Sequence, residues 1–230
     1  METYGTTTTP VATLGTDTRA AFITRTYLHL FGAMLLFAGI EVFLFTSGLA
    51  FPIAEAMLGV SWLFVLGAFI IVGWFASRAA HMATSPVAQY AALGGFVLAE
   101  AIVFVPLLVI AFLQFPGAIQ SAAWVTLFGF TGLTAVAVMT RKDFSFLGGL
   151  LRWGFIVAII LIVASVLFGF HLGTFFSVAM IALAGGAILY DTSNVLHHYP
   201  EDRHVAAALE LFASVALMFW YVLQLIMSRR

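Results

Sequence analysis

Seven long apolar stretches dominate this chain and restrict the folds open to it. A helix needs about 20 apolar residues to cross the hydrocarbon core of a bilayer. The stretches that reach this length are 27–49, 53–76, 86–112, 117–139, 146–168, 171–193 and 205–227. Only 8% of the residues are charged and 63% are hydrophobic, whereas a soluble domain carries roughly 25% charged residues. Because the apolar runs are continuous and do not alternate, they predict helices rather than barrel strands. We expect an all-α polytopic membrane protein with seven transmembrane helices.

The segments between these stretches predict one domain and one tail. Most are short, which favours antiparallel neighbours within a single domain over 27–230. Pro86 and Pro116-Gly117 open the third and fourth stretches, and proline is well placed in a first helical turn. The first 26 residues are polar and contain a threonine run, so we expect residues 1–26 to form a mobile tail. The tail lacks the basic-then-apolar order of a secretory signal, so we expect no cleavage.

The distribution of Lys and Arg predicts the orientation in the membrane. If all seven stretches span, one side receives Arg19, Arg25, Arg78, Arg141, Lys142, Arg152 and Arg203. Only Arg229 and Arg230 fall on the other side. Positively charged loops stay in the cytoplasm, which predicts a cytoplasmic N-terminus and an outer C-terminus in the inner (plasma) membrane. The terminal arginine pair departs from the rule and leaves open a re-entrant seventh segment.

Four acids lie inside the apolar stretches, where a charge is costly and usually marks function. At 1.5 Å per residue, Asp191 and Glu210 fall near the cytoplasmic side, and Glu41 and Glu100 fall near the midplane. Two layers of acids suit a path for cations or protons. Structural alternatives remain open. Glu41 and Glu100 could donate a hydrogen bond as neutral acids, Asp191 could anchor a helix end, and Glu210 could be interfacial.

The spacing of Glu210 and Ser214 indicates how the acids near the cytoplasmic side could act together. The two residues are four apart and share a helix face, on which they could meet Asp191 across the sixth and seventh helices. Two close carboxylates share a proton at low pH and attract a cation when both are ionised. Asp191 and Glu210 are therefore our candidate calcium ligands. Arg78 could instead pair with Asp191, and the choice between the two partners would be a pH-sensitive latch.

Several classes of function are excluded or disfavoured. A net charge of −1 excludes nucleic acid held by a basic surface. The chain has no Cys, which removes thiol catalysis and cysteine-ligated metals. No Ser-His or multi-His arrangement stands at a usable depth, so we expect no enzyme. The single lysine, Lys142, lies in a loop and cannot form the buried Schiff base of a retinal protein. We expect no cofactor apart from calcium as a transported or bound ion.

Two motifs resemble a known family. Residues 141–148 read R-K-D-F-S-F-L-G, which resembles the K-R-D-F-S-x-L-G signature of the Bax inhibitor family. Residues 188–193 read I-L-Y-D-T-S, which resembles its sixth-helix Y-D-T motif. The hydrophobic profile is similar over roughly 25–227. The resemblance implies seven helices packed around a central helix, which we identify with the sixth, ending in the stretch 185–198. It also implies a pH-dependent calcium leak in some members and modulation of a membrane-bound AAA protease by some bacterial members.

Only some of the family's functional residues are present in this chain. Asp191 matches the first acid of the family's aspartate pair. The second acid belongs to a pattern resembling L-Y-L-D, where this chain has L-F-A-S, so Ser214 stands in its place. Arg78 matches the family's latch arginine by position. Glu100 follows Leu98-Ala99 where many members have Gly-Pro, so it is specific to this sequence. Ser214 resembles the protease-modulator branch. We therefore expect a pH-sensitive calcium or cation leak, with modulation of a membrane AAA quality-control protease as the alternative.

Overall fold

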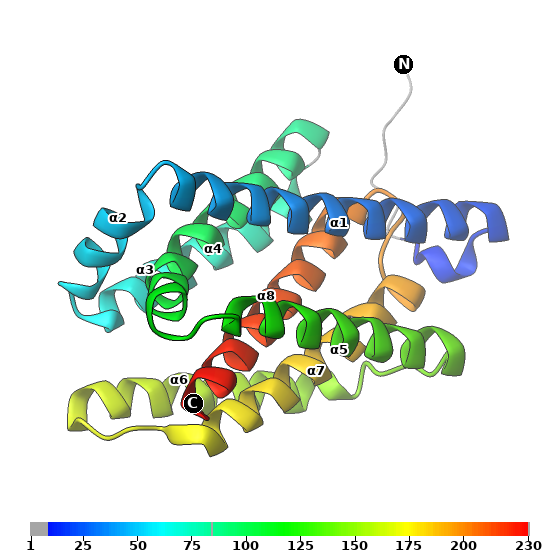
Figure 1. The fold of residues 1–230 in the computed structure, drawn as a ribbon. Coiled ribbons are helices and arrows are strands. Elements are labelled where there is room, and N and C mark those ends of the chain that lie inside the picture. Colours follow the sequence, from blue (N-terminus) through cyan, green and yellow to red (C-terminus); the bar gives the residue numbers. More distant parts are fainter. Residues whose placement is uncertain (1–8, 84, 230) are drawn as a thin grey trace.

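The computed structural model describes residues 9–83 and 85–229 and is helical throughout its length. Over these residues the elements are η1 (Val11–Thr13), α1 (Thr16–Thr46), α2 (Ala50–Leu58), α3 (Trp62–Met82), α4 (Pro86–Gln114), α5 (Ala118–Thr140), α6 (Leu147–Phe168), α7 (Gly173–His197) and α8 (His204–Ser228) (Figure 1). Within the described part of the chain, seven of these helices are long and apolar enough to cross a membrane. The prediction of an all-α protein with seven membrane-spanning helices is confirmed.

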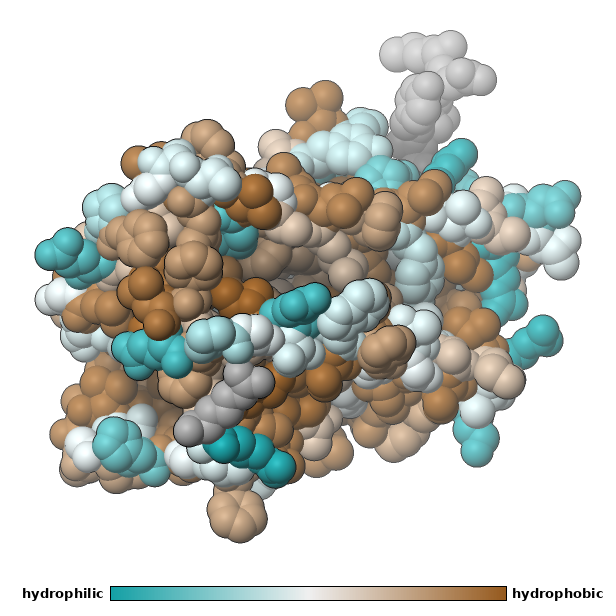
Figure 2. All heavy atoms as spheres, viewed as in Figure 1, coloured by the Kyte–Doolittle hydropathy of each residue, from teal (hydrophilic) through white to brown (hydrophobic). Residues whose placement is uncertain are grey.

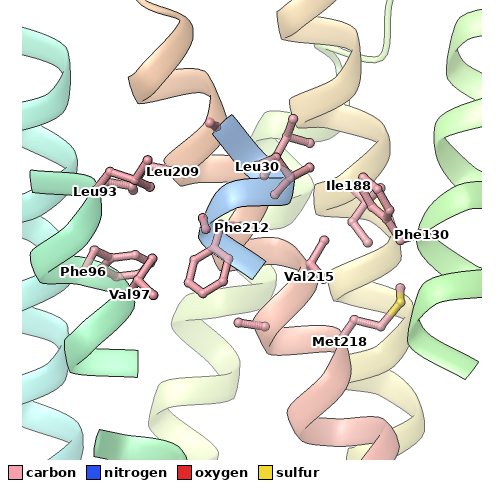
Figure 3. Close-up of a cluster of buried hydrophobic side chains, with 14 of the residues drawn as sticks. Leu30, Leu93, Phe96, Val97, Phe130, Ile188, Leu209, Phe212, Val215 and Met218 are labelled. Atoms are coloured by element: carbon pink, nitrogen blue, oxygen red, sulfur yellow. The ribbon is translucent and has the colours of Figure 1, made fainter. Parts of the chain in front are cut away.

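The central helix is α8. Its apolar span is 72% buried inside the protein, against 33% for α7 and 11% for α3 and for α6. It contacts α1, α3, α4, α5 and α7 and runs through the middle of the bundle (Figure 1). Figure 3 shows Phe212 and Val215 of α8 between the side chains of α4 and those of α7. Our identification of the sixth span, α7, as the central helix is therefore wrong.

The composition of α8 explains why it can be enclosed on so many sides. Ala206, Ala207 and Ala208 follow one another in its first turns and are all fully or almost fully buried. Small side chains let neighbouring helices approach closely. By contrast, α6 contacts only α3 and α7 within the described structure and exposes most of its surface. Both helices are strongly hydrophobic, so the sequence did not show which of them is enclosed by other helices.

The beginning of the chain is more ordered than we predicted. The first helix starts at Thr16 rather than near residue 27. Ahead of it, Val11 is fully buried, and its N–H donates to the carbonyl oxygen of Tyr199 in the α7–α8 loop. A buried apolar side chain and a backbone hydrogen bond tie down a segment whose composition alone predicts a mobile tail. The stretch 9–26, which we expected to be a tail, thus contains η1 and the first turns of α1, and residues 1–8 lie outside the described part.

The second predicted span, 53–76, is two helices. Gly48, with φ of +78°, ends the turn after α1, and the nine-residue α2 follows. Ser61 is extended and starts α3. Ala50 and Ala54 of α2 pack against Val105 and Val109 of α4, so α2 is held beside the bundle instead of forming the first half of a span. The membrane-crossing helix is α3, which reaches Met82.

The two ends of the bundle differ in charge. Arg25, Arg78, Arg141 and Arg203 lie where α1 and α8 begin and α3 and α5 end, and we call this the basic end. It faces right in Figure 2, where hydrophilic residues lie along the edge; other hydrophilic residues lie at the left and in the lower centre, and hydrophobic side chains cover much of the surface between them. The pattern fits a bilayer around the middle of the bundle. The cytoplasmic placement of the basic end stays a prediction.

Candidate functional site

A cavity of about 720 Å³ lies between α3, α4, α6, α7 and α8. Three carboxylic acids line it, each from a different helix: Glu100 of α4, Asp191 of α7 and Glu210 of α8. Ser77 and Ser214 contribute hydroxyl groups, and Arg152 contributes the guanidinium group in the lining. An acid-rich cavity inside an apolar bundle is the usual setting of an ion pathway. We therefore treat this acidic cavity as the candidate site.

Asp191 lies within a helix and not at its end. Because α7 continues to His197, the carboxyl group stands almost two turns inside the helix, farther from the end than in the predicted span 171–193. Its Oδ2 accepts a hydrogen bond of 2.6 Å from Oγ of Ser214 on α8. The residue that replaces the family's second aspartate is thus in direct contact with the first. A serine there orients the carboxyl group without adding a second charge.

Glu210 is held by α3. Its Oε1 accepts a 2.6 Å hydrogen bond from Oγ of Ser77, and Nδ1 of His81 lies 3.8 Å from the same oxygen. That nitrogen also donates to the carbonyl oxygen of Ser77 at 2.8 Å. Glu210 is close enough to Asp191 for the two carboxyl groups to interact electrostatically. Sequence analysis missed Ser77 and His81, although their i, i+4 spacing on one face of an apolar helix was the available signal.

Tyr199 covers this group of residues from the α7–α8 loop. Its hydroxyl lies 3.3 Å from Nε2 of His81. Burial, together with the nearby carboxyl groups of Glu210 and Asp191, raises the pKa of Tyr199 well above its ordinary value. The phenol therefore stays protonated at physiological pH and remains a hydrogen-bond donor beside His81.

The predicted latch between Arg78 and Asp191 is not formed. The guanidinium carbon of Arg78 lies 5.4 Å from the centroid of the Trp74 ring, and the side chain is exposed outside the cavity. A guanidinium over an aromatic face is a favourable contact in its own right. The arginine that does line the cavity is Arg152 of α6, which we had used only to predict orientation.

The two deeper acids have different surroundings. Glu100 lies midway along α4 and lines the cavity. Glu41 does not line it, and both of its carboxyl oxygens are sealed without a hydrogen-bond partner among the described residues. Glu41 lies five residues before the end of α1 at Thr46. Of the two acids predicted for the inner layer, only Glu100 lines the acidic cavity.

A second cavity of about 580 Å³ continues toward the opposite end of the bundle, where His171 and Gln224 line it. The two cavities share four lining residues: Trp62, Ile162, Trp220 and Tyr221. The rings of Trp62 and Trp220 are stacked, with centroids 5.8 Å apart and an interplanar angle of 24°. This aromatic layer, joining α3 to α8, separates the acidic cavity from the second one.

The two motif segments are locked to each other. The N–H of Phe144 donates to Oγ of Ser193 at 2.9 Å, and that hydroxyl donates to Oδ1 of Asp143 at 3.3 Å. Nε2 of His198 lies 3.4 Å from Oδ2 of Asp143. The backbone N–H of Ser145 holds the pKa of Asp143 below its ordinary value. The loop before α6 is thus fastened to the last turns of α7, next to Asp191.

The described residues show no cluster of three or more His, Cys, Asp or Glu side chains arranged to hold a metal ion. Calcium takes six to eight oxygen ligands in stable sites, and Asp191 and Glu210 supply at most four carboxyl oxygens. The geometry gives no support to a permanent calcium site, and calcium binding by this pair stays a prediction about a transported ion.

Comparison with known sequences identifies the family. The model of the family described as inhibitor of apoptosis-promoting Bax1 matches residues 19–230. The chain belongs to the Bax inhibitor-1 family. The match covers every membrane-spanning helix, and both motif segments, 141–148 and 188–193, fall within it. The predicted family membership is therefore confirmed.

Relatives in this family carry different names. The modulator of FtsH protease YccA from Escherichia coli is 35% identical over 96 residues, which is 40% of this chain and 42% of that protein. Bax inhibitor 1 of Schizosaccharomyces pombe is 31% identical over 142 residues, or 60% of this chain and 49% of the relative. The uncharacterized protein Cj0236c of Campylobacter jejuni is 29% identical over 216 residues, or 90% and 88%. The chain thus spans less than half the length of the first two relatives.

Proposed function

We propose that this member of the Bax inhibitor-1 family is a pH-sensitive leak for cations, with calcium or protons as the ions. The observation that carries the proposal is the convergence of Glu100, Asp191 and Glu210 in one cavity. When ionised, three carboxylates outweigh the single guanidinium of Arg152 in attracting a cation. When protonated, they lose that attraction. The flux would therefore depend on the pH of the solution that reaches the cavity.

The replacement of the family's second aspartate by Ser214 changes how such a leak works in this chain. Asp191 receives a neutral hydrogen bond from Ser214, and the second carboxyl group comes from Glu210, held in place by Ser77. Glu100 provides the next acid along the cavity, before the aromatic layer of Trp62 and Trp220. That layer lines both cavities and would keep a basal leak small.

The test is calcium flux into liposomes that contain the purified protein and a calcium-sensitive dye. We expect flux that changes between about pH 6 and 8, the range in which shifted carboxyl groups of functional sites titrate. Asp191→Asn should abolish it. Glu55→Gln is the matched control, because Glu55 is exposed on α2 and outside the cavity. Absence of flux at every pH, or unchanged flux from Asp191→Asn, would rule the leak out.

A second function is supported by one relative's name. Since the similar E. coli protein is a modulator of FtsH protease, we propose as the alternative that this chain restrains a membrane-bound AAA quality-control protease. Purification from native membranes should then recover the protease with the full chain. Deletion of residues 1–8 tests whether the N-terminal segment makes the contact. Failure to recover any protease with either version would count against this function.

We also propose that the protein lies in the inner membrane with its basic end in the cytoplasm. The relative in a second E. coli strain is named inner membrane protein YccA, and the arginine distribution follows the positive-inside rule. Because the chain lacks Cys, single cysteines at Gly15 and Ser228 give clean labelling sites. An impermeant maleimide added outside spheroplasts should label only the Ser228→Cys variant, and the reverse result would overturn the orientation.

A further inference from the structure

A separate hollow of about 650 Å³ lies at the basic end, between the starts of α1 and α4 and the α7–α8 loop. It has no lining residue in common with the acidic cavity. Residues of both charge signs line it: the acids Asp17, Glu201 and Asp202, and the base Arg25. We call it the charged hollow.

An apolar groove of about 300 Å³ continues from the charged hollow along α1 and α4. Its walls are hydrophobic, with Leu28 and Leu36 on α1 and Leu93 and Val97 on α4. Tyr90 lines both the hollow and the groove, so the two spaces adjoin. Going inward from the basic end, the surface changes from charged to apolar at the level of Tyr90.

A polar contact marks this boundary. Nε2 of His29 lies 2.9 Å from the hydroxyl of Tyr90, and the two rings stack with centroids 5.4 Å apart. Nδ1 of His29 donates to the carbonyl oxygen of Arg25 at 2.7 Å. Aromatic rings with a polar tip sit at the level of the lipid headgroups. The hollow then lies at headgroup depth and the groove at the depth of the acyl chains.

The charges in the hollow are available to a ligand. Arg25, Asp17 and Glu201 form no ion pair with one another or with any other side chain in the described structure, and Asp202 is paired only with Arg203, at 3.4 Å. Opposite charges that face one space without neutralising each other match a zwitterion. Three carboxyl groups suit an ammonium group, and one guanidinium suits a phosphate.

We propose that the hollow and the groove together bind one phospholipid with an ethanolamine headgroup. Its ammonium group meets the carboxyl groups of Asp17 and Glu201, its phosphate meets Arg25, and one acyl chain lies in the groove. A primary ammonium carries N–H donors for carboxylate oxygens, whereas the quaternary ammonium of choline carries none. The sequence of charge, aromatic boundary and apolar wall follows the sequence of chemical groups along that lipid.

The floor of the groove contains two glycines, Gly32 and Gly94. A Cβ atom built on either would meet no heavy atom within 4 Å. The same holds for Gly39 on α1 and Gly95 on α4, which do not line the groove. A larger side chain at Gly94 or Gly32 therefore fills the groove, and one at Gly95 or Gly39 is a matched control.

The experiment uses the full-length protein, freed of lipid in detergent and offered equal amounts of phosphatidylethanolamine, phosphatidylcholine and phosphatidylglycerol. Native mass spectrometry then measures the retained lipid. We expect the wild type to prefer phosphatidylethanolamine by about tenfold, the ratio that corresponds to about 1.4 kcal/mol. Asp17→Asn with Glu201→Gln should remove the preference over phosphatidylcholine. Arg25→Gln should reduce retention of all three lipids.

The glycine pairs separate a specific site from general lipid contact. Gly94→Leu should abolish retention, and Gly95→Leu should leave it at the wild-type level. Thermal unfolding in lipid-free detergent checks that both variants are folded, and the Gly32→Leu and Gly39→Leu pair gives the same comparison on α1. Equal retention of the three lipids by the wild type, equal loss within each glycine pair, or a second protein copy cross-linked across the groove would overturn the proposal.

Discussion

Two buried glutamates of neighbouring helices provide the most informative comparison in this molecule. Glu41 of α1 and Glu100 of α4 are 7% and 6% exposed, respectively, and both lie in helices that could cross a membrane. Glu100 faces the acidic cavity with Asp191 and Glu210. Both oxygens of Glu41 are enclosed without a hydrogen-bond partner in the described structure. The two glutamates are therefore equally buried but lie in different surroundings, one in a cavity and the other in a closed apolar core.

The difference shows that depth in the membrane does not assign a role to a carboxyl group. A carboxyl group that faces a cavity can exchange protons and meet ions. A sealed one without partners only adds an unfavourable polar group to an apolar core. We accordingly expect substitutions of Glu100 to change the flux and substitutions of Glu41 to change the stability. The following experiments test this difference.

The largest expected effect is on flux through Glu100. Glu100→Gln should lower calcium flux in liposomes by at least about tenfold, which corresponds to the loss of about 1.4 kcal/mol of attraction for the ion. Glu41→Gln should leave the flux within about twofold of the wild type, because its side chain does not reach the cavity. Equal reductions from the two variants would show that both acids belong to one path.

Removing the aromatic layer should have the next largest effect. Trp62→Ala opens the stack of Trp62 on Trp220 and should raise calcium flux about fivefold by widening the passage between the cavities, as at hydrophobic constrictions of channels. Trp124→Ala is the control, since Trp124 stacks on Phe128 of its own helix and lines neither cavity. If both variants behave alike, the layer is only packing.

The third experiment measures the cost of the sealed acid. Glu41→Met keeps the length of the side chain and removes the two unpartnered oxygens, so it should raise the free energy of unfolding by about 1–3 kcal/mol, the usual cost of an unsatisfied buried group. Glu100→Met should give a smaller gain, because that carboxyl group is open to the cavity. Chemical denaturation in detergent gives both values. A loss of stability in Glu41→Met would indicate an unseen partner.

The smallest expected effect concerns Asp143, the acid in the motif of residues 141–148. Asp143 is exposed and its pKa is lowered, first by the N–H of Ser145. A lowered pKa means that the ionised form stabilises the folded loop, so the contribution is present above the ordinary value of 3.8 and is lost as the pH falls through the lower folded value. Protection of the amides of residues 143–146 from hydrogen exchange, measured relative to the intrinsic rate at each pH, should therefore fall only in that acidic range. Asp143→Asn should show low protection at all pH values.

The site was only partly predictable from the sequence. The i, i+4 spacing of Glu210 and Ser214 correctly put both beside the helix that carries Asp191, because helix geometry fixes which residues share a face. The partner contributed by α3 was not predictable. Arg78 is turned onto Trp74, and Ser77, one position earlier, reaches Glu210 instead. One residue is a 100° rotation on a helix, and apolar surroundings on all sides gave no pattern to fix that rotation.

The sequence by itself determined the number of spans, the basic end and the family, because length, hydrophobicity, arginine placement and the two motifs are local properties of the chain. Tertiary structure decided that α8 rather than α7 is central, that residues 9–26 are ordered, and that Glu100 but not Glu41 reaches the cavity. The physical reason is the solvent. Lipid tails are as apolar as a protein core, so a side chain facing lipid and one facing another helix look alike in the sequence, and only packing distinguishes them.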